Sequence, residues 1–152
     1  MDWPDKDDNN ALIARAKILV VDREYHTRKS IRSLLQAMGC RKIHEASDAV
    51  SGLKAIHALE PDVVLLDWGI TGMEAAEFVR SLRSGTTHSD ANVPIIMLAG
   101  HPERWRVLEA VRLGVHEFLL KPVSKPALRE RMLSALAKPG ARKRAALHKL
   151  AS

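Results

Sequence analysis

Short apolar runs alternate along the chain with longer stretches in which apolar residues recur at helical spacing. The runs cover residues 17–22, 41–46, 63–67, 95–98 and 117–120. Continuous β-branched runs are typical of strands that are buried on both faces of a sheet. A helical stretch follows each run, and a helix is the usual crossover between parallel strands. The pattern therefore predicts an α/β domain of five βα units around a parallel sheet.

The helices expected between these strands have recognisable ends and buried faces. They cover residues 25–38, 48–60, 73–84, 103–113 and a last stretch that begins at 124. Ser47 or Asp48 is expected to cap the second helix, since short polar side chains accept hydrogen bonds from the first turn. Helical spacing places Val50, Phe78 and Val111 on faces that turn toward the sheet.

The net charge of +6 is concentrated at the C-terminal end of the chain. Residues 138–152 contain five basic side chains and no acidic one, which leaves residues 1–137 with a net charge of only +1. We divide the chain into an acidic flexible leader (1–13), a globular domain (14–137) and a basic C-terminal tail (138–152). The tail could bind nucleic acid, anionic lipid or an acidic partner, or extend freely into solvent.

Composition and motifs narrow the class of protein. Hydrophobic residues make up 46% of the chain and charged residues 28%, as in ordinary soluble proteins. No apolar run approaches the roughly 20 residues that span a bilayer, and the acidic N-terminus lacks the layout of a signal peptide. The one cysteine, Cys40, cannot form an internal disulfide, so we expect a cytoplasmic protein. Without a phosphate-binding glycine loop or a metal-binding histidine spacing, an enzyme with an external small substrate has the least support.

Charged residues follow three of the predicted strands. Asp22 and Asp67 end the first and third strands, and Lys121, followed by Pro122, comes directly after the fifth. Ligands of open parallel sheets bind at the carboxyl ends of the strands, where the strand order reverses. A lone aspartate after a strand often only caps a loop. Two carboxylates and an ammonium at one edge of a sheet make a candidate site.

These residues resemble the site of the CheY-like receiver domain of bacterial two-component response regulators, and the resemblance covers roughly residues 16–137. It implies a flavodoxin-like fold, a doubly wound (βα)5 arrangement with strand order 2-1-3-4-5. It also implies that Asp67 accepts a phosphoryl group from a histidine kinase or a histidine phosphotransfer protein. Asp22, Lys121 and Pro122 match further residues of the family's phosphate pocket.

The metal side of the site departs from the family's pattern. The resemblance implies Mg²⁺ bound by Asp22, Asp67 and the backbone carbonyl of Gly69, together with a second acid after the first strand. Arg23 stands at that position and cannot coordinate a cation. We expect Mg²⁺ binding to be weakened at least about tenfold, or to be absent, because carboxylates are its main protein ligands. Glu24 could substitute as a ligand, but it more naturally begins the next helix.

Arg23 itself allows two arrangements. Its guanidinium could pair with Asp67 and take the place of the cation, or it could point into solvent beside the pocket. The switching side also departs from the family, since Ala99 replaces a threonine or serine after the fourth strand. Phe118 matches the family's switch aromatic, but at Ala99 there is no hydroxyl for it to respond to.

Three functions from different classes follow. The first is a single-domain response regulator that is phosphorylated on Asp67 and signals to a downstream protein. An exposed Trp105 would then be a candidate partner surface, unless this tryptophan packs over its own helix. The second is a pseudo-receiver that docks partners without phosphorylation, with Arg23 in place of the metal. The third is a nucleic-acid or membrane binder that uses residues 138–152.

Overall fold

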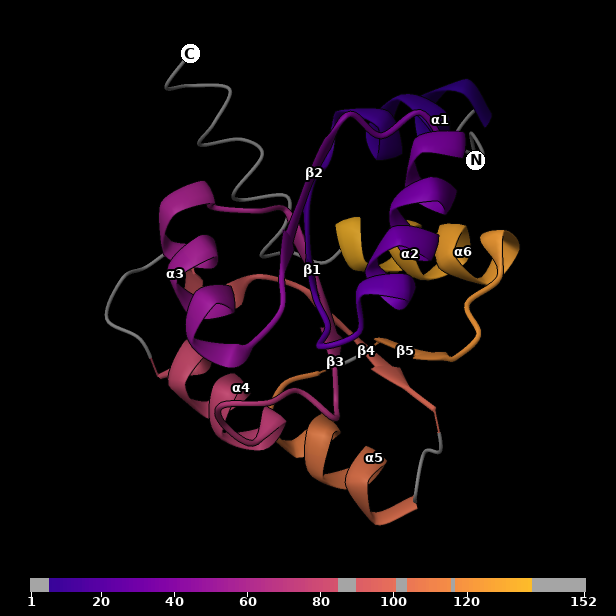
Figure 1. Ribbon diagram of the computed structural model, residues 1–152. Helices are drawn as coiled ribbons and strands as arrows, with labels where there is room; N and C mark the ends of the chain where they lie inside the picture. Colours follow the sequence, from indigo (N-terminus) through magenta and orange to yellow (C-terminus); the bar gives the residue numbers. More distant parts are fainter. Residues whose placement is uncertain (1–5, 85–89, 101–103, 116, 138–152) are drawn as a thin grey trace.

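One parallel sheet of five strands forms the centre of the molecule (Figure 1). The computed structural model describes residues 6–84, 90–100, 104–115 and 117–137. The strand order is β2-β1-β3-β4-β5, as predicted, with every neighbouring pair parallel. The strands are β1 (Lys17–Val21), β2 (Lys42–Ala46), β3 (Val63–Asp67), β4 (Ile95–Ala99) and β5 (Glu117–Leu120). The predicted flavodoxin-like fold is therefore confirmed.

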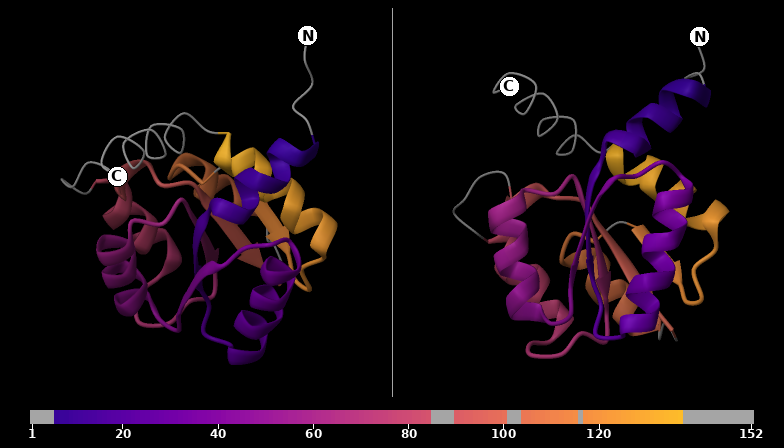
Figure 2. Two further views of the ribbon diagram at one scale, coloured as in Figure 1. Left: turned by 90° about the horizontal axis from the view of Figure 1, so that it is seen from above. Right: turned by 45° about the horizontal axis from the view of Figure 1, so that its top comes forward.

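Helices cover both faces of this sheet (Figure 2). One face carries α1 (Lys6–Arg15), α2 (Tyr25–Ala37) and α6 (Lys125–Leu136). The other carries α3 (Ala49–Leu59), α4 (Ala75–Arg83) and α5 (Arg104–Arg112). A short 3₁₀ helix, η1 (Asp90–Asn92), precedes β4. None of the described helices combines the length and the apolar character needed to cross a membrane.

Two hydrophobic cores lie on opposite faces of the sheet because successive strand side chains point to opposite sides. In β3, Val64 and Leu66 face the core under α3, α4 and α5. Leu65 faces the core under α1, α2 and α6. All five β3 residues are buried, as expected for a central strand with helices on both sides.

The prediction of a flexible leader over residues 1–13 is wrong for its described part. Residues 6–13 lie in α1, and Ile13, only 1% exposed, packs into the core under α2 and α6. Asn10 accepts a hydrogen bond of 2.8 Å from Arg129 of α6. Burial of one isoleucine is worth about 1.5–3 kcal/mol, which helps to hold a helix whose acidic and asparagine-rich sequence has little helical propensity. Residues 1–5 and the basic tail 138–152 lie outside the described structure.

The predicted helix faces are correct for one element and partly wrong for two others. Phe78 is fully buried, as expected, and Asp48 caps α3 by accepting a hydrogen bond from the Ser51 amide at 2.8 Å. Val50 and Val111, which were expected to face the core, are 51% and 46% exposed. Each lies at the edge of the buried stripe of its helix. At such a position, a small rotation about the helix axis changes whether the side chain is buried in the core or exposed to solvent.

Candidate functional site

The two aspartates come together because neighbouring strands end at the same level. Val21 of β1 pairs with Leu66 of β3, so Asp22 and Asp67 are the next residues on adjacent strands. Adjacent strands lie about 4.8 Å apart, which brings two carboxylates into one pocket. Asp22 is completely buried and the side chain of Asp67 is only 7% exposed.

Lys121 supplies the cation between them. Its Nζ lies 2.8 Å from Asp22 Oδ2 and 3.2 Å from Asp67 Oδ1. The backbone amide of Lys121 donates to the Ala99 carbonyl at 2.9 Å, which continues the pairing of β5 with β4 and fixes where the side chain starts. The peptide bond between Lys121 and Pro122 is cis.

The ion pairs change the protonation of Lys121. Burial, the largest influence, lowers the pKa of this ammonium, but the hydrogen bond and charge of Asp22 and the charge of Asp67 together outweigh it. The net result is a pKa raised above the ordinary lysine value. Lys121 therefore stays charged throughout the physiological range.

The two oxygens of Asp67 have different surroundings. Oδ1 accepts a hydrogen bond of 3.0 Å from the Gly69 amide and is also the oxygen that faces Lys121. Oδ2 is the partner in neither of these two contacts. Asp67 thus caps its own loop, as a strand-end aspartate commonly does, and also presents a second oxygen that is not used by the loop.

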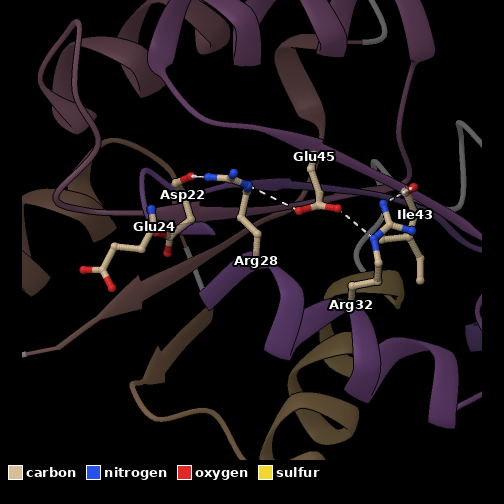
Figure 3. A network of polar contacts seen from close by, with 6 residues as sticks. All are labelled: Asp22, Glu24, Arg28, Arg32, Ile43 and Glu45. Carbon is tan, nitrogen blue, oxygen red and sulfur yellow. Dashed lines mark hydrogen bonds and ion pairs between the residues drawn. The ribbon is translucent and has the colours of Figure 1, made fainter. Parts of the chain in front are cut away.

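Of the two arrangements considered for Arg23, the described structure has the exposed one. The Arg23 side chain is exposed, and the cation paired with Asp67 is Lys121. Glu24 begins α2 as its N-cap residue, and its backbone amide donates to Asp22 Oδ1 at 2.9 Å. Its own carboxylate is exposed and directed away from Asp22 (Figure 3).

An arginine that the sequence analysis did not identify also contacts the site (Figure 3). Arg28 Nη1 donates to the backbone carbonyl of Asp22 at 2.6 Å, and Arg28 Nε pairs with Glu45 of β2 at 3.2 Å. A basic residue one turn into the helix that follows the first strand is a signal in the sequence, but basic residues are common on solvent-facing helix surfaces. Only the fold reveals which of them reaches the strand end.

The remaining predicted site residues lie around the same strand ends. Ala99 is 9% exposed and ends β4, and Phe118 of β5 is half-buried against the core under α3, α4 and α5. Gly69 is exposed in the loop after Asp67. Trp105 lies in α5, but its side chain is outside the described part of the structure, so the partner surface proposed for it stays a prediction.

The described residues do not offer the full donor set of the Mg²⁺ site that the resemblance implies. Within the described ranges, no three His, Cys, Asp or Glu side chains are grouped so that they could hold a metal ion. The buried Oδ2 of Asp22 faces the ammonium of Lys121 at 2.8 Å instead. Two carboxylates that share one ammonium are a poorer cation site than the cluster of acids that Mg²⁺ prefers.

Fold and site together define a receiver domain. The model of the response regulator receiver domain family matches residues 18–133, and the chain belongs to this family. Receiver domains are signalling domains of two-component systems, which is the class indicated by the paired aspartates and the lysine.

Curated relatives and solved structures agree with this assignment. The chain is 27% identical over 116 residues to chemotaxis protein CheY-3 of Vibrio cholerae, and the aligned part covers 76% of this chain and 88% of that relative. It is 28% identical over 116 residues to chemotaxis protein CheY of Pseudomonas aeruginosa, and the aligned part covers 76% of this chain and 92% of that relative. The structure of Vibrio cholerae chemotaxis protein CheY4 superposes with a TM-score of 0.71 at 26% identity and covers 80% of this chain and 98% of that one.

Proposed function

We propose that Asp67 accepts a phosphoryl group from a phosphohistidine of a histidine kinase or histidine phosphotransfer protein. The observation that carries this proposal is the asymmetric environment of the Asp67 carboxylate. One oxygen faces Lys121 at 3.2 Å and accepts a hydrogen bond from the Gly69 amide, and the other takes part in neither contact. A carboxylate nucleophile needs one such oxygen for in-line attack, and positive charge close by to neutralise the incoming phosphoryl oxygens.

In the proposed step, Asp67 Oδ2 attacks the phosphorus atom of the phosphohistidine. The new O–P bond forms as the N–P bond breaks. The electron pair of the N–P bond returns to the imidazole nitrogen, which then takes up a proton. The product on this chain is an acyl phosphate. The ammonium of Lys121 lies between Asp22 and Asp67 and has three N–H donors. It can therefore also donate to the oxygens of the phosphoryl group once this group is bound to Asp67.

For the metal, we propose that Mg²⁺ binds at least about tenfold more weakly here than at a site with an acid in place of Arg23. Arg23 contributes no ligand, and Glu24 is turned away. The substitution Arg23→Asp is expected to raise the affinity for Mg²⁺ by at least about tenfold, measured by titration calorimetry. Arg23→Asn, which removes the positive charge without adding a carboxylate, is the matched control. Equal affinities for the two variants would mean that the repulsion by Arg23, and not a missing ligand, weakens binding.

We further propose that phosphorylation of Asp67 changes the conformation of this domain less than it does in receivers that have a hydroxyl after β4. Ala99 offers only a methyl group where that hydroxyl would bind the phosphoryl oxygen, and a hydrogen bond to a charged oxygen is worth about 1.5–3 kcal/mol. The signal would pass to a downstream protein through surface contacts.

The test is incubation with a small-molecule phosphoryl donor, with and without Mg²⁺, followed by intact mass measurement. We expect one phosphoryl adduct that is absent in Asp67→Asn. Dependence of this adduct on Mg²⁺ would show that a metal still takes part. Absence of an adduct, under conditions in which an ordinary receiver is labelled, would contradict phosphoryl transfer and favour a phosphorylation-independent docking module.

A further inference from the structure

Arg28 makes the contact that links the pocket to the edge of the sheet (Figure 3). Its side chain is only 14% exposed, and Nη1 donates to the Asp22 carbonyl at 2.6 Å. Nε of the same group lies 3.2 Å from Glu45 Oε1 on strand β2. One planar group therefore spans the end of β1 and the edge strand, which suits the fixed geometry of an arginine.

Glu45 is itself held from its other side. Arg32, one turn further along α2, pairs with Glu45 Oε2 at 2.7 Å and donates to the Ile43 carbonyl at 3.0 Å. The two arginines thus hold the same carboxylate, but only Arg28 contacts Asp22. Exposed ion pairs contribute little by themselves. The contact of Arg28 with Asp22 differs from the Arg32 contacts because it reaches a residue that is completely buried.

Both backbone groups of Asp22 are tied to β2. Its amide donates directly to the Ala46 carbonyl at 3.1 Å, and its carbonyl is held through Arg28 to Glu45. The orientation of this carbonyl fixes the peptide that follows it, and the chain then turns so that the Glu24 amide can donate to Asp22 Oδ1. The carboxylate's other oxygen faces Lys121.

We propose that Arg28 is a positioning residue of the pocket, which keeps the Asp22 carboxylate on Lys121 by holding the Asp22 carbonyl against Glu45. The role concerns the same site as the proposed function, but its test uses no phosphoryl donor. Failure of one proposal is therefore distinguishable from failure of the other.

The sign of the effect on Lys121 separates positioning from simple electrostatics. If Arg28 only added positive charge near the pocket, its removal would leave both ion pairs of Lys121 in place, and the acetylation of Lys121 would not rise. If Arg28 positions Asp22, its removal lets the Asp22 carboxylate leave Lys121 Nζ, which lies 2.8 Å from it. The ammonium is then held by Asp67 alone and becomes more accessible to the reagent.

The experiment is competitive acetylation of the whole chain near neutral pH, with the modification of each lysine read by peptide mass spectrometry. Arg28→Met removes the guanidinium and keeps most of the alkyl stem. Arg28→Lys keeps the positive charge but removes the planar guanidinium that contacts Asp22 and Glu45 at the same time. Arg32→Met is the matched control, since it removes a guanidinium from the same helix and the same Glu45 without touching Asp22. Lys17, whose Nζ donates to the Leu59 carbonyl at the opposite end of β1, reports general loosening.

We expect the acetylation of Lys121 to rise several-fold in both Arg28 variants, because its ion pair with Asp22 is loosened, and to stay unchanged in Arg32→Met. Lys17 should be unaffected in all three. An unchanged or reduced rate at Lys121 in the Arg28 variants would overturn the proposal, as would an equal rise in Arg32→Met. A parallel rise at Lys17 would also overturn it, because Arg28 would then stabilise the fold in general. If Arg28→Met does not fold, the result for Arg28→Lys decides by the same criteria.

Discussion

At the scale of single residues, the charge balance of the pocket depends on Lys121. Asp22 has no exposed surface, and its Oδ2 faces the ammonium at 2.8 Å. Removing one member of a buried pair leaves the other charge buried without a partner, at a typical cost of 3–5 kcal/mol. Because Lys121 is itself 20% exposed, the lower end of this range applies.

We therefore predict that Lys121→Met lowers the free energy of unfolding by about 3 kcal/mol at neutral pH. Urea unfolding followed by circular dichroism measures this change. Lys54→Met, at an exposed position of α3, is the control and should change the free energy by less than about 0.5 kcal/mol. Equal effects of the two substitutions would show that the ion pairs of Lys121 contribute no net stability.

The raised pKa of Lys121 also predicts how its contribution depends on pH. A group whose pKa is higher in the folded state stabilises fully below its unfolded value, here 10.5, and loses that contribution as the pH rises through the folded value. The difference in unfolding free energy between the wild type and Lys121→Met should therefore be constant up to about pH 10 and shrink above it. Urea titrations of both proteins at a series of alkaline pH values test this. A difference that already declines near neutral pH would contradict the raised pKa.

The site residues that could be predicted from sequence are those whose place follows from strand ends. Asp22, Asp67 and Lys121 each end or follow a strand, and parallel strands bring such positions together wherever the sheet forms. The orientation of Arg23 and the role of Arg28 could not be predicted in this way. Both depend on where a long side chain finds a partner on another element, which a single sequence does not specify.

At the scale of elements, α1 is the helix that the sequence pattern missed. Its acidic and asparagine-rich first half resembles a solvated leader, and its stability comes from tertiary contacts rather than from propensity. The strands β1, β3 and β4 were predictable because burial on both faces forces continuous apolar runs. Val50 and Val111 were placed wrongly because helical spacing defines a face only to within a fraction of a turn.

We predict that Ile13→Ala destabilises the protein by about 2–5 kcal/mol, since Ile13 is 1% exposed and packs in the core under α2 and α6. It should also make Cys40 more reactive toward a thiol reagent. The Cys40 Sγ donates to the Ile13 carbonyl at 3.4 Å, and burial raises the pKa of this thiol to about 11. Urea unfolding and the rate of thiol labelling measure the two effects.

Arg15→Ala is the control for this prediction, because Arg15 lies in the same helix with an exposed side chain. It should change the stability by less than about 0.5 kcal/mol and leave the labelling of Cys40 unchanged. Rapid labelling of Cys40 in the wild type would contradict the prediction, because it would mean that α1 does not remain packed against the core in solution.

At the scale of the whole molecule, the two cores are joined only through the sheet that separates them. Each central strand sends alternate side chains to both faces, so neither core can lose its packing without disturbing the strands that carry the other. A single cooperative unfolding transition is therefore expected for the domain, as for most domains of this size.

A substitution in one core, read by a probe in the other, tests this cooperativity. Phe78 of α4 is fully buried in the core on one face of the sheet, and Cys40 is buried on the opposite face. Phe78→Ala should lower the free energy of unfolding by about 3–5 kcal/mol. The urea midpoint at which Cys40 becomes reactive should shift as far as the midpoint measured by circular dichroism. Val50→Ala, at a position 51% exposed, should move neither midpoint appreciably. If Phe78→Ala shifted the circular dichroism midpoint and left that of Cys40 in place, the two faces would unfold separately, and strain at Asp67 would not be transmitted through the sheet to both layers of helices.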